Sequence, residues 1–488
     1  MNRVLAIDFG ASSGRAIIGE YDGDKITLKE IHRFSNDPVN LGGTMYWDFL
    51  RLFHEIKQSL IRSKEYGKVD SLAIDTWGVD FGLIDKKGRL LENPVHYRDR
   101  RTNGMVGASE EFISPDRLYE LTGIQTMEIN SAFQLLSLVK NRRELIKRAD
   151  KLLMMPDLFA FFLGAKKVAE MSIASTTQLF EADSKEWSDE CINSLGIERH
   201  LFPEIVNSGT VIGTLSPEIC EELDIEPMKI IATCGHDTQS AMVSVPAKEK
   251  DFAFLSCGTW SLLGTELDSP VINKSSAELN VSNETGYGGK TSFLKNIIGL
   301  WLIQESRRQW MREGKQYSYM ELEEMAKKAE PFKCFIDPDA PEFTPAGDIP
   351  ERIKQYCEKT GQYVPEDDGE VMRCIYESLA LKYRQSIAEL EACTGKRFNT
   401  LYMVGGGTKD RFLSQLTACS IGRKVYAGPV EATSFGNIAV QLMSIGAIEN
   451  IGKAREIIAR SEVLYEFLPS DKELWDKAYA DYLKVTKK

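Results

Sequence analysis

Apolar positions in the first hundred residues predict several strands and one helix. Short apolar runs at 4–9, 15–21, 25–33 and 71–75 are typical of strands, and 47–63 has the spacing of an amphipathic helix. Turn sequences at 22–24 and 86–88 separate neighbouring strands, which favours hairpins. The pattern predicts an α/β fold with a mixed sheet and disfavours a purely parallel dinucleotide-binding fold.

A similar strand–turn–strand pattern returns in the second half of the chain. Residues 251–268 repeat the apolar strand, the glycine turn with hydroxyl residues and the second apolar strand, with Gly258 in the place of Gly10. A fold built from two duplicated sheet domains would explain this repeat, although so short a turn also recurs by chance.

Two further segments predict the core of the second domain. Residues 401–404 read as a strand that enters the glycine turn 405–407 and a helix from about residue 409. Residues 371–390 have helical spacing, with Asp367 or Asp368 as a plausible cap and Gly395 as the stop.

Domain boundaries are expected where polar and proline-containing segments interrupt these patterns. The segment 244–247 is followed by three charged residues and precedes the second hairpin. We therefore expect a first domain over 1–245, a second over 246–450 and a helical C-terminal extension over 451–488.

Composition and charge exclude several classes of protein. The 43% hydrophobic and 27% charged residues are typical of an ordinary globular chain, and no apolar run reaches the roughly 18 residues needed to cross a bilayer. A net charge of −12 opposes binding to nucleic acid or to an anionic membrane. The first apolar run is too short and too acidic for a secretory signal, so we expect a cytoplasmic protein.

Cysteine and histidine positions argue against a zinc site or a secreted disulfide framework. Nine cysteines include no CxxC motif, and the five histidines do not cluster. Cys357 and Cys374 lie 17 residues apart on predicted helical ground and could form a disulfide if oxidised, although a reducing cytosol disfavours it. Any metal is expected on carboxylates, waters and phosphates, the oxygen ligands that magnesium prefers.

The segment 8–15 combines a carboxylate, glycines and small hydroxyl residues directly after a predicted strand. Asp8 ends the strand, Gly10 and Gly14 allow an anion to approach the backbone, and Arg15 adds positive charge. This arrangement suits a metal-bound polyphosphate. An ordinary β-turn is the alternative for the segment taken alone.

Two later glycine turns extend this prediction to the second half. The turn 258–261 supplies hydroxyl groups that could contact the same nucleotide, and glycines at 405–407 leave room for a flat group against the backbone. A tight strand-to-helix turn explains one of those glycines equally well. None of these segments matches a Walker loop or a GxGxxG motif.

Asp237 is the best candidate for a general base, which transfer of a phosphoryl group to a sugar hydroxyl requires. It follows an apolar strand at 229–233 and is flanked by His236 and Thr238. A helix cap or a structural histidine would be the simpler interpretation of this pair. The segment 75–80 is similar, and Trp77 could stack on a sugar ring or belong to the core.

Taken together and in order, these segments resemble the FGGY family of carbohydrate kinases over residues 1 to about 450. The resemblance implies two duplicated actin-like, ribonuclease-H-like ATPase domains around a central cleft, with ATP and Mg²⁺ as cofactors. It implies that Asp8 helps to hold the magnesium and that Asp237 is the base. The implied ATP contacts are Ala11, Ser12, Ser13, Gly14, Arg15, Thr259, Gln304 and Gly406. The implied sugar contacts are Gly78, His236, Asp237, Thr238 and Asn296, with Asp99 and Arg101 as second-tier contacts.

Several segments most resemble the branch of the family that phosphorylates L-rhamnulose on its 1-hydroxyl. They include IDTWGVDFGLID, CGHDTQSA, LSCGTWSLLG and MVGGGTKDRFLSQL. Another ketose kinase acting on L-fuculose or D-xylulose is the first alternative, because a few hydroxyl contacts decide between sugars. A non-kinase actin-like ATPase is the second. The expected partner is a small ketose, and the sequence leaves monomer and homodimer open.

Overall fold

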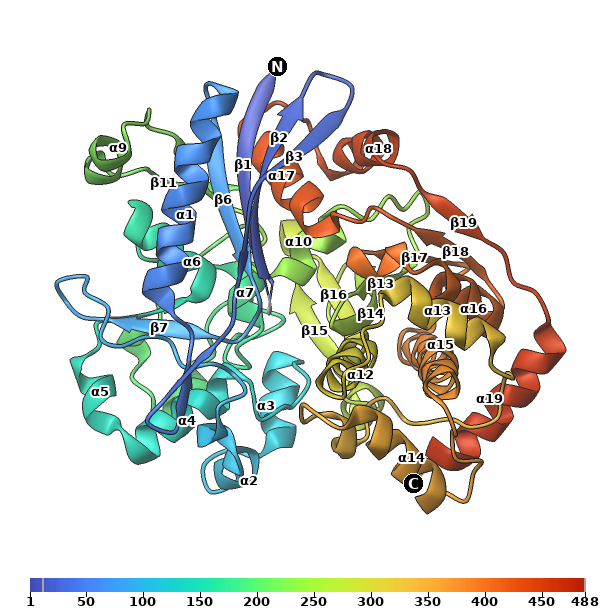
Figure 1. Ribbon diagram of the computed structural model, residues 1–488. Coiled ribbons are helices and arrows are strands. Elements are labelled where there is room, and N and C mark those ends of the chain that lie inside the picture. The colour runs from blue at the N-terminus through green and yellow to red at the C-terminus, as the bar shows by residue number, and fades with distance from the viewer. Residues whose placement is uncertain (11–12, 487–488) are drawn as a thin grey trace. The chain divides into compact units, whose positions relative to one another are not determined.

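The computed structural model describes residues 1–10 and 13–486, which form two compact units (Figure 1). The first unit comprises Met1–Pro246, Glu266–Phe293 and Ala432–Glu462. The second comprises Ala247–Thr265, Leu294–Glu431 and Val463–Lys488. Each unit therefore draws on segments that are distant in the sequence.

A mixed six-stranded sheet forms the centre of the first unit. Its order is β11-β12-β6-β1-β2-β3, with β1 antiparallel to β2 and parallel to β6. The strands span Asn2–Phe9 (β1), Ser13–Tyr21 (β2), Ile26–Ser35 (β3), Ser71–Thr76 (β6), Thr210–Thr214 (β11) and Lys229–Ala232 (β12). The predicted early strands and the hairpin at 22–24 are confirmed.

Helices cover both faces of this sheet because the side chains of β1 alternate between them. Leu5 and Ile7 pack in a cluster with helices α1 (Phe49–Ser63) and α6 (Met155–Leu163). Val4 and Ala6 pack in another cluster with α10 (Asp237–Val243), α17 (Ala432–Ser444) and α18 (Ile451–Ser461). The sheet is therefore buried on both sides, and polar side chains at its strand ends are held in rigid surroundings.

Smaller elements complete the first unit around a third apolar cluster. Strand β7 (Phe81–Ile84) pairs with β8 (Lys151–Met154), and the turn 86–88 is closed by a single antiparallel bridge from Ile84 to Leu90, which makes the predicted hairpin a short one. The remaining strands and helices are β4 (Val39–Leu41), β5 (Thr44–Tyr46), β9 (Val168–Glu170), β10 (Glu204–Val206), β15 (Ser282–Thr285), α2 (Met105–Ser109), α3 (Pro115–Thr122), α4 (Ser131–Asn141), α5 (Arg143–Arg148), α7 (Met171–Ser175), α8 (Asp189–Ser194), α9 (Pro217–Leu223) and α11 (Lys274–Glu278).

The second unit repeats the strand arrangement of the first. Strand β13 is antiparallel to β14 and parallel to β17, as β1 is to β2 and β6. The strands run in the order β16-β14-β13-β17-β18-β19. They span Ala253–Cys257 (β13), Trp260–Leu267 (β14), Thr291–Ile298 (β16), Thr400–Val404 (β17), Lys424–Ala427 (β18) and Tyr465–Phe467 (β19). The repeat noticed in the sequence thus corresponds to a repeated topology.

The long helix α15 (Asp368–Thr394) begins and ends where the sequence predicts. The Asp367 side chain accepts the backbone N–H of Glu370, and Gly395 ends the helix with a left-handed φ of 65°. The other helices of the second unit are α12 (Trp301–Arg312), α13 (Tyr319–Lys328), α14 (Ile349–Lys359), α16 (Arg411–Ile421) and α19 (Lys472–Thr486). None of the described helices combines the length and the apolar character that crossing a bilayer requires.

Candidate active site

Two carboxyl groups face each other across the ends of neighbouring strands in the first unit. Asp8 on β1 and Asp75 on β6 are partners in the parallel register, and both are buried. Arg15, opposite Asp8 on β2, donates hydrogen bonds of 2.8 and 3.0 Å to Asp8 Oδ2. The sheet itself therefore concentrates negative charge at this edge, and one arginine offsets part of it.

The environment of Asp75 disfavours its ionised form. Burial, followed by the negative charge of Asp8, raises the pKa of Asp75 well above its usual value, although Asn437 donates a hydrogen bond to its Oδ2. The other oxygen, Oδ1, is buried and has no hydrogen-bond partner among the described residues. An oxygen in this position suits a proton or a bound cation.

Asp237 stands at the start of α10, beside the end of β6. The backbone holds it there, because Thr76 N–H donates to the carbonyl oxygen of Gly235 at 2.9 Å. Its side chain remains 29% exposed. Burial raises the pKa of Asp237 to about 6, opposed by His236 and assisted by Asp8. The carboxylate is therefore ionised near neutral pH and accessible enough to accept a proton.

His236 links Asp237 to a second carboxylate. Its Nδ1 lies 2.9 Å from Oε2 of Glu284 on β15, and its Nε2 lies 3.5 Å from Oδ1 of Asp237. Burial alone would lower the pKa of His236, but the charge and the hydrogen bond of Glu284 raise it overall. Gln239 also donates to Glu284 Oε2 at 3.0 Å. Glu284 thus holds the imidazole in place and favours its charged form.

A buried glutamate anchors the loop that precedes Asp237. Glu170 Oε2 accepts hydrogen bonds from Gly235 N–H at 2.8 Å and from the Ser172 hydroxyl at 2.6 Å. The same hydroxyl accepts the N–H of His236 at 3.3 Å. The bonds from Gly235 N–H and His236 N–H fix backbone within two residues of Asp237, so Glu170 helps to define where that carboxylate points.

Gly78 and Thr238, two of the expected sugar contacts, lie on either side of this loop region. A Cβ at Gly78 would approach the Thr176 side chain to 3.2 Å, so a larger residue would press against α7 and its C-terminal turn. The Thr238 hydroxyl lies 3.2 Å from Asp237 Oδ1 and donates to it. Thr238 therefore borders the candidate base, whereas Gly78 borders Thr176.

Trp77 belongs to the core rather than to an open surface. It is 5% exposed, and its ring centroid lies 4.0 Å from that of Trp47. Both indole N–H groups donate to Asp80 Oδ2, at 2.9 and 2.6 Å, and the Gln134 amide donates to Oδ1 at 2.9 Å. Burial still raises the pKa of Asp80 to about 6. Of the two alternatives for Trp77, the structure supports the core.

Asp99 and Arg101 form part of the same polar network. Asp99 accepts the backbone N–H of Met45 at 2.8 Å and that of Arg101 at 2.9 Å. Arg101 Nη2 donates to Gln134 Oε1 at 2.6 Å, whereas its buried Nε has no partner among the described residues. That nitrogen is a donor that a bound hydroxyl group could satisfy.

The first hydroxyl turn is only partly described, because Ala11 and Ser12 lie outside the described residues. Gly10 N–H donates to Ser13 C=O at 3.0 Å, and Asn36 donates to Gly10 C=O at 2.8 Å. Ser13 is exposed. A Cβ at Gly14 would lie 2.2 Å from the Phe34 ring, so packing requires glycine there.

The second unit holds the other expected nucleotide contacts. In the β13–β14 hairpin, the Thr259 hydroxyl donates to Gln304 Oε1 at 3.1 Å, from the first turn of α12. Gly299 and Trp301 N–H donate to Thr259 C=O at 3.2 and 3.1 Å. Asn296 lies on β16 of this unit. The hairpin and α12 are therefore joined at the threonine that the sequence singled out.

Three consecutive glycines follow β17 for different reasons. Gly405 has a φ of 89°, and a Cβ at Gly407 would lie 2.4 Å from Cys257 Sγ. A Cβ at Gly406 would meet nothing within 4 Å. Backbone geometry and packing account for two of the glycines, and Gly406 is the one that borders open space.

The structure also places residues near Asp237 that sequence reasoning missed as parts of this site. Asp75 ends a strand as Asp8 does, a signal that was available but was assigned to sugar binding. Glu170, Glu284 and Asn437 come from segments with no motif, and only tertiary packing brings them to the carboxylates.

The described carboxylates suit magnesium held partly by phosphate oxygens. Among residues 1–10 and 13–486, the only group of three or more His, Cys, Asp or Glu with ligand atoms within 4.8 Å of one another is a cysteine trio in the second unit. Magnesium commonly binds one or two carboxylates together with substrate phosphates. Asp8 fits that mode. Asp75 beside it adds an oxygen, Oδ1, that has no hydrogen-bond partner among the described residues.

Comparison with known proteins covers nearly the whole chain. Residues 3–244 match the N-terminal domain, and residues 253–445 the C-terminal domain, of the FGGY family of carbohydrate kinases. A rhamnulokinase of Bacteroides thetaiotaomicron is 42% identical over 98% of this chain and 98% of its own. A rhamnulokinase of Bacillus subtilis is 38% identical over 96% of this chain and 95% of its own.

Solved structures agree with the fold described above. A ligand-bound xylulose kinase from Lactobacillus acidophilus has a TM-score of 0.83 at 16% identity, covering 99% of this chain and 98% of that one. A Plasmodium falciparum glycerol kinase with ADP has a TM-score of 0.80 at 17% identity, covering 100% and 98%. The likeness confirms the predicted α/β fold with mixed sheets.

Proposed function

Because this chain belongs to the FGGY family of carbohydrate kinases, we propose that it transfers the γ-phosphoryl group of ATP to the 1-hydroxyl of L-rhamnulose. The products are L-rhamnulose 1-phosphate and ADP. The observation that carries the choice of sugar is the set of rhamnulokinases that are 36–42% identical over nearly the full chain. The kinase chemistry is supported separately by the carboxylates of the first unit.

Asp237 acts as the general base in this proposal. An alcohol is a weak nucleophile near neutral pH, so a carboxylate must accept its proton as the phosphorus–oxygen bond forms. A pKa of about 6 suits this role, because the group is ionised at neutral pH and is still basic enough to take a proton. His236 and Glu284 orient the carboxylate and keep it ionised.

Asp8 holds the magnesium in this proposal, and Asp75 lies next to Asp8 on the neighbouring strand. When bound, the ion neutralises charge on the transferred phosphoryl group. Arg15 restrains Asp8 through its two hydrogen bonds, so the carboxylate keeps one orientation. The surroundings of Asp75 favour a protonated or cation-bound carboxyl group. In either state Asp75 does not repel the adjacent carboxylate of Asp8.

Nucleotide binding is assigned to both hydroxyl turns and to the glycine turn after β17. The residues are Ala11, Ser12, Ser13, Gly14, Arg15, Thr259, Gln304 and Gly406. The open space above Gly406 is suited to a flat adenine ring, and the Thr259 hydroxyl is suited to a phosphate oxygen.

Sugar binding is assigned to Gly78, His236, Asp237, Thr238 and Asn296. Asp99 and Arg101 remain second-tier candidates, and the unpartnered Arg101 Nε supports including the arginine. A site that pairs several sugar hydroxyls discriminates strongly, because an inverted hydroxyl leaves a buried polar group unpaired at a cost of about 1–3 kcal/mol.

A substrate panel tests the proposal. ADP release is measured with L-rhamnulose, L-fuculose, D-xylulose and glycerol, each with and without Mg²⁺. We expect L-rhamnulose to give the highest kcat/KM, ahead of L-fuculose by at least about fivefold, with glycerol poorer still. A higher kcat/KM for L-fuculose or D-xylulose would overturn the choice of sugar while leaving the kinase chemistry intact.

A further inference from the structure

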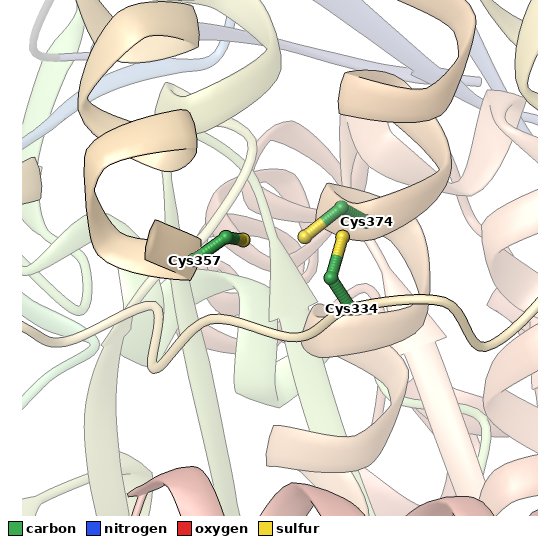
Figure 2. A group of neighbouring side chains, drawn as sticks. All are labelled: Cys334, Cys357 and Cys374. Atoms are coloured by element: carbon green, nitrogen blue, oxygen red, sulfur yellow. The ribbon is translucent and has the colours of Figure 1, made fainter. Parts of the chain in front are cut away.

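Three cysteines from separate segments of the second unit converge on one point. Cys334 lies between α13 and α14, Cys357 lies on α14 and Cys374 on α15 (Figure 2). Their sulfur atoms all lie within 4.8 Å of one another. All three side chains are buried, and none is part of a disulfide. We name this group the cysteine triad.

The spacing of the triad is close to what a single thiolate-bound metal ion requires. A metal–sulfur distance of about 2.3 Å places the sulfurs of a tetrahedral or trigonal site about 3.8–4.0 Å apart. The bound of 4.8 Å on the sulfur separations exceeds that spacing by only about 1 Å. Buried cysteines often serve only as small apolar residues, but such residues need not point their sulfurs at one another.

We propose that Cys334, Cys357 and Cys374 bind one thiophilic metal ion, Zn²⁺ or Cu⁺. Thiolate ligands select these two ions among the biological metals. The two differ in coordination: Zn²⁺ in structural sites takes four ligands, whereas Cu⁺ accepts three sulfurs. The Ser378 hydroxyl, 4.0 Å from Cys374 Sγ, is a neutral oxygen beside the triad that could serve as a fourth ligand.

Binding exchanges protons for the metal, so that the step balances. Each thiol that becomes a ligand loses one proton to solvent as its metal–sulfur bond forms, and no electron is transferred. Affinity should therefore increase as the pH rises.

The consequence of binding is a cross-link between three segments of the second unit. The ion would tie the segment before α14 and α14 itself to α15. The same helix carries Tyr383, whose hydroxyl lies 2.7 Å from the Ser261 hydroxyl on β14. A bound ion would therefore stabilise the helix that supports the β13–β14 hairpin, and it has no part in the proposed phosphoryl transfer.

The test is metal titration of the full chain, reduced, freed of metal by a chelator and kept under anaerobic conditions. Zn²⁺ and Cu⁺ are added separately in competition with chromophoric chelators, and Cd²⁺ serves as a spectroscopic probe through its sulfur-to-metal charge-transfer band. We expect one equivalent to bind per chain and Tm to rise on binding. Cys334→Ala, Cys357→Ala and Cys374→Ala should each weaken binding by at least about tenfold.

Cys393→Ala is the matched control, because Cys393 lies on α15 outside the triad. It should leave affinity and stoichiometry unchanged. Should the triad variants fail to fold, alkylation of the wild type answers the same question. In mild denaturant, the metal should protect Cys334, Cys357 and Cys374 from N-ethylmaleimide, as mapped by mass spectrometry, and should leave Cys393 reactive.

Two results would overturn the proposal. One is the absence of a charge-transfer band and of stoichiometric binding by every ion tested, with the thiols shown to be reduced. The other is binding or protection that is equally strong at Cys393 and at the triad.

Discussion

His236 Nδ1 lies 2.9 Å from Oε2 of Glu284, and both side chains are buried. This contact raises the pKa of His236, which burial alone would lower. The charge on His236 in turn lowers the pKa of Asp237, against the burial and the Asp8 charge that raise it. Glu284, which acts on the proposed base through His236, thus helps to set the pH at which that base is ionised.

Glu284→Gln should shift the acid limb of the pH profile to higher pH. Without the Glu284 charge, the pKa of His236 falls, so a smaller fraction of the imidazole is protonated and it favours the Asp237 carboxylate less. The pKa of Asp237 should then rise above about 6. The measurement is kcat/KM for the ketose against pH, together with the His236 pKa from NMR.

Glu278→Gln serves as the control, since Glu278 is an exposed carboxylate on α11 whose ion pair is with Lys274. Its acid limb should coincide with that of the wild type. An unchanged acid limb in Glu284→Gln, with a lowered His236 pKa, would show that Asp237 is not the group that titrates.

Asp237→Asn should remove the base while leaving the site's shape. We expect kcat to fall by about 10²-fold or more and KM for ATP to change less than about twofold. In the wild type, kcat/KM should decrease about tenfold per pH unit below about pH 6, because the base must be ionised. Turnover within about threefold of the wild type would exclude Asp237 as the base.

Local patterns in the sequence were sufficient to predict much of the fold. The α15 helix illustrates this, because its apolar spacing, its Asp367 cap and its Gly395 stop are all encoded within the segment itself. The repeated hairpins at Gly10 and Gly258 were visible for the same reason. The resemblance of the motifs also predicted the family, which the comparisons confirm, and the two-domain actin-like ATPase fold of that family.

Features created by packing between distant segments were not predictable in this way. Glu284 and Asn437 reach the carboxylates from 45 or more residues away in the sequence, and no local pattern marks them. The pairing of β7 with β8 has the same origin, because the two strands are far apart in the sequence. The convergence of Cys334 with Cys357 and Cys374 likewise follows from tertiary packing.

Asp75→Asn should increase stability while reducing activity. The native pKa of Asp75 lies well above its usual value, so the wild type loses stability as pH rises from about 4 toward that native pKa. Asparagine removes this loss and can still accept the hydrogen bond from Asn437. The gain should therefore be larger at pH 7 than at pH 4, because the wild-type penalty grows as the pH rises toward the native pKa.

Thermal denaturation at pH 4 and pH 7 measures this effect, with Asp85→Asn as the control. Hydrogen bonds from the Arg89 backbone and others lower the pKa of Asp85, so its replacement should not raise Tm. If Tm of Asp75→Asn fell equally at both pH values, the carboxyl group would be stabilising, contrary to the argument from burial.

Trp77→Phe should weaken the core without impairing sugar binding. The substitution keeps the aromatic contact with Trp47 but removes one of the N–H donors to Asp80 Oδ2. A buried carboxyl group that loses a donor costs about 1–3 kcal/mol of stability. Because donors favour the ionised form, the pKa of Asp80 should rise above about 6.

The pH dependence of the stability loss identifies its cause. At pH 5, Asp80 is largely protonated in both proteins. At pH 8 the Asp80 carboxylate is ionised in the wild type, where it accepts one more N–H donor than in the variant. The Tm difference should therefore be larger at pH 8. Trp187→Phe is the matched control, because it removes a buried indole N–H bonded to the Pro203 carbonyl, whose effect should not depend on pH.

KM for the ketose should stay within about twofold in both variants, and a tenfold increase confined to Trp77→Phe would instead place that ring against the sugar.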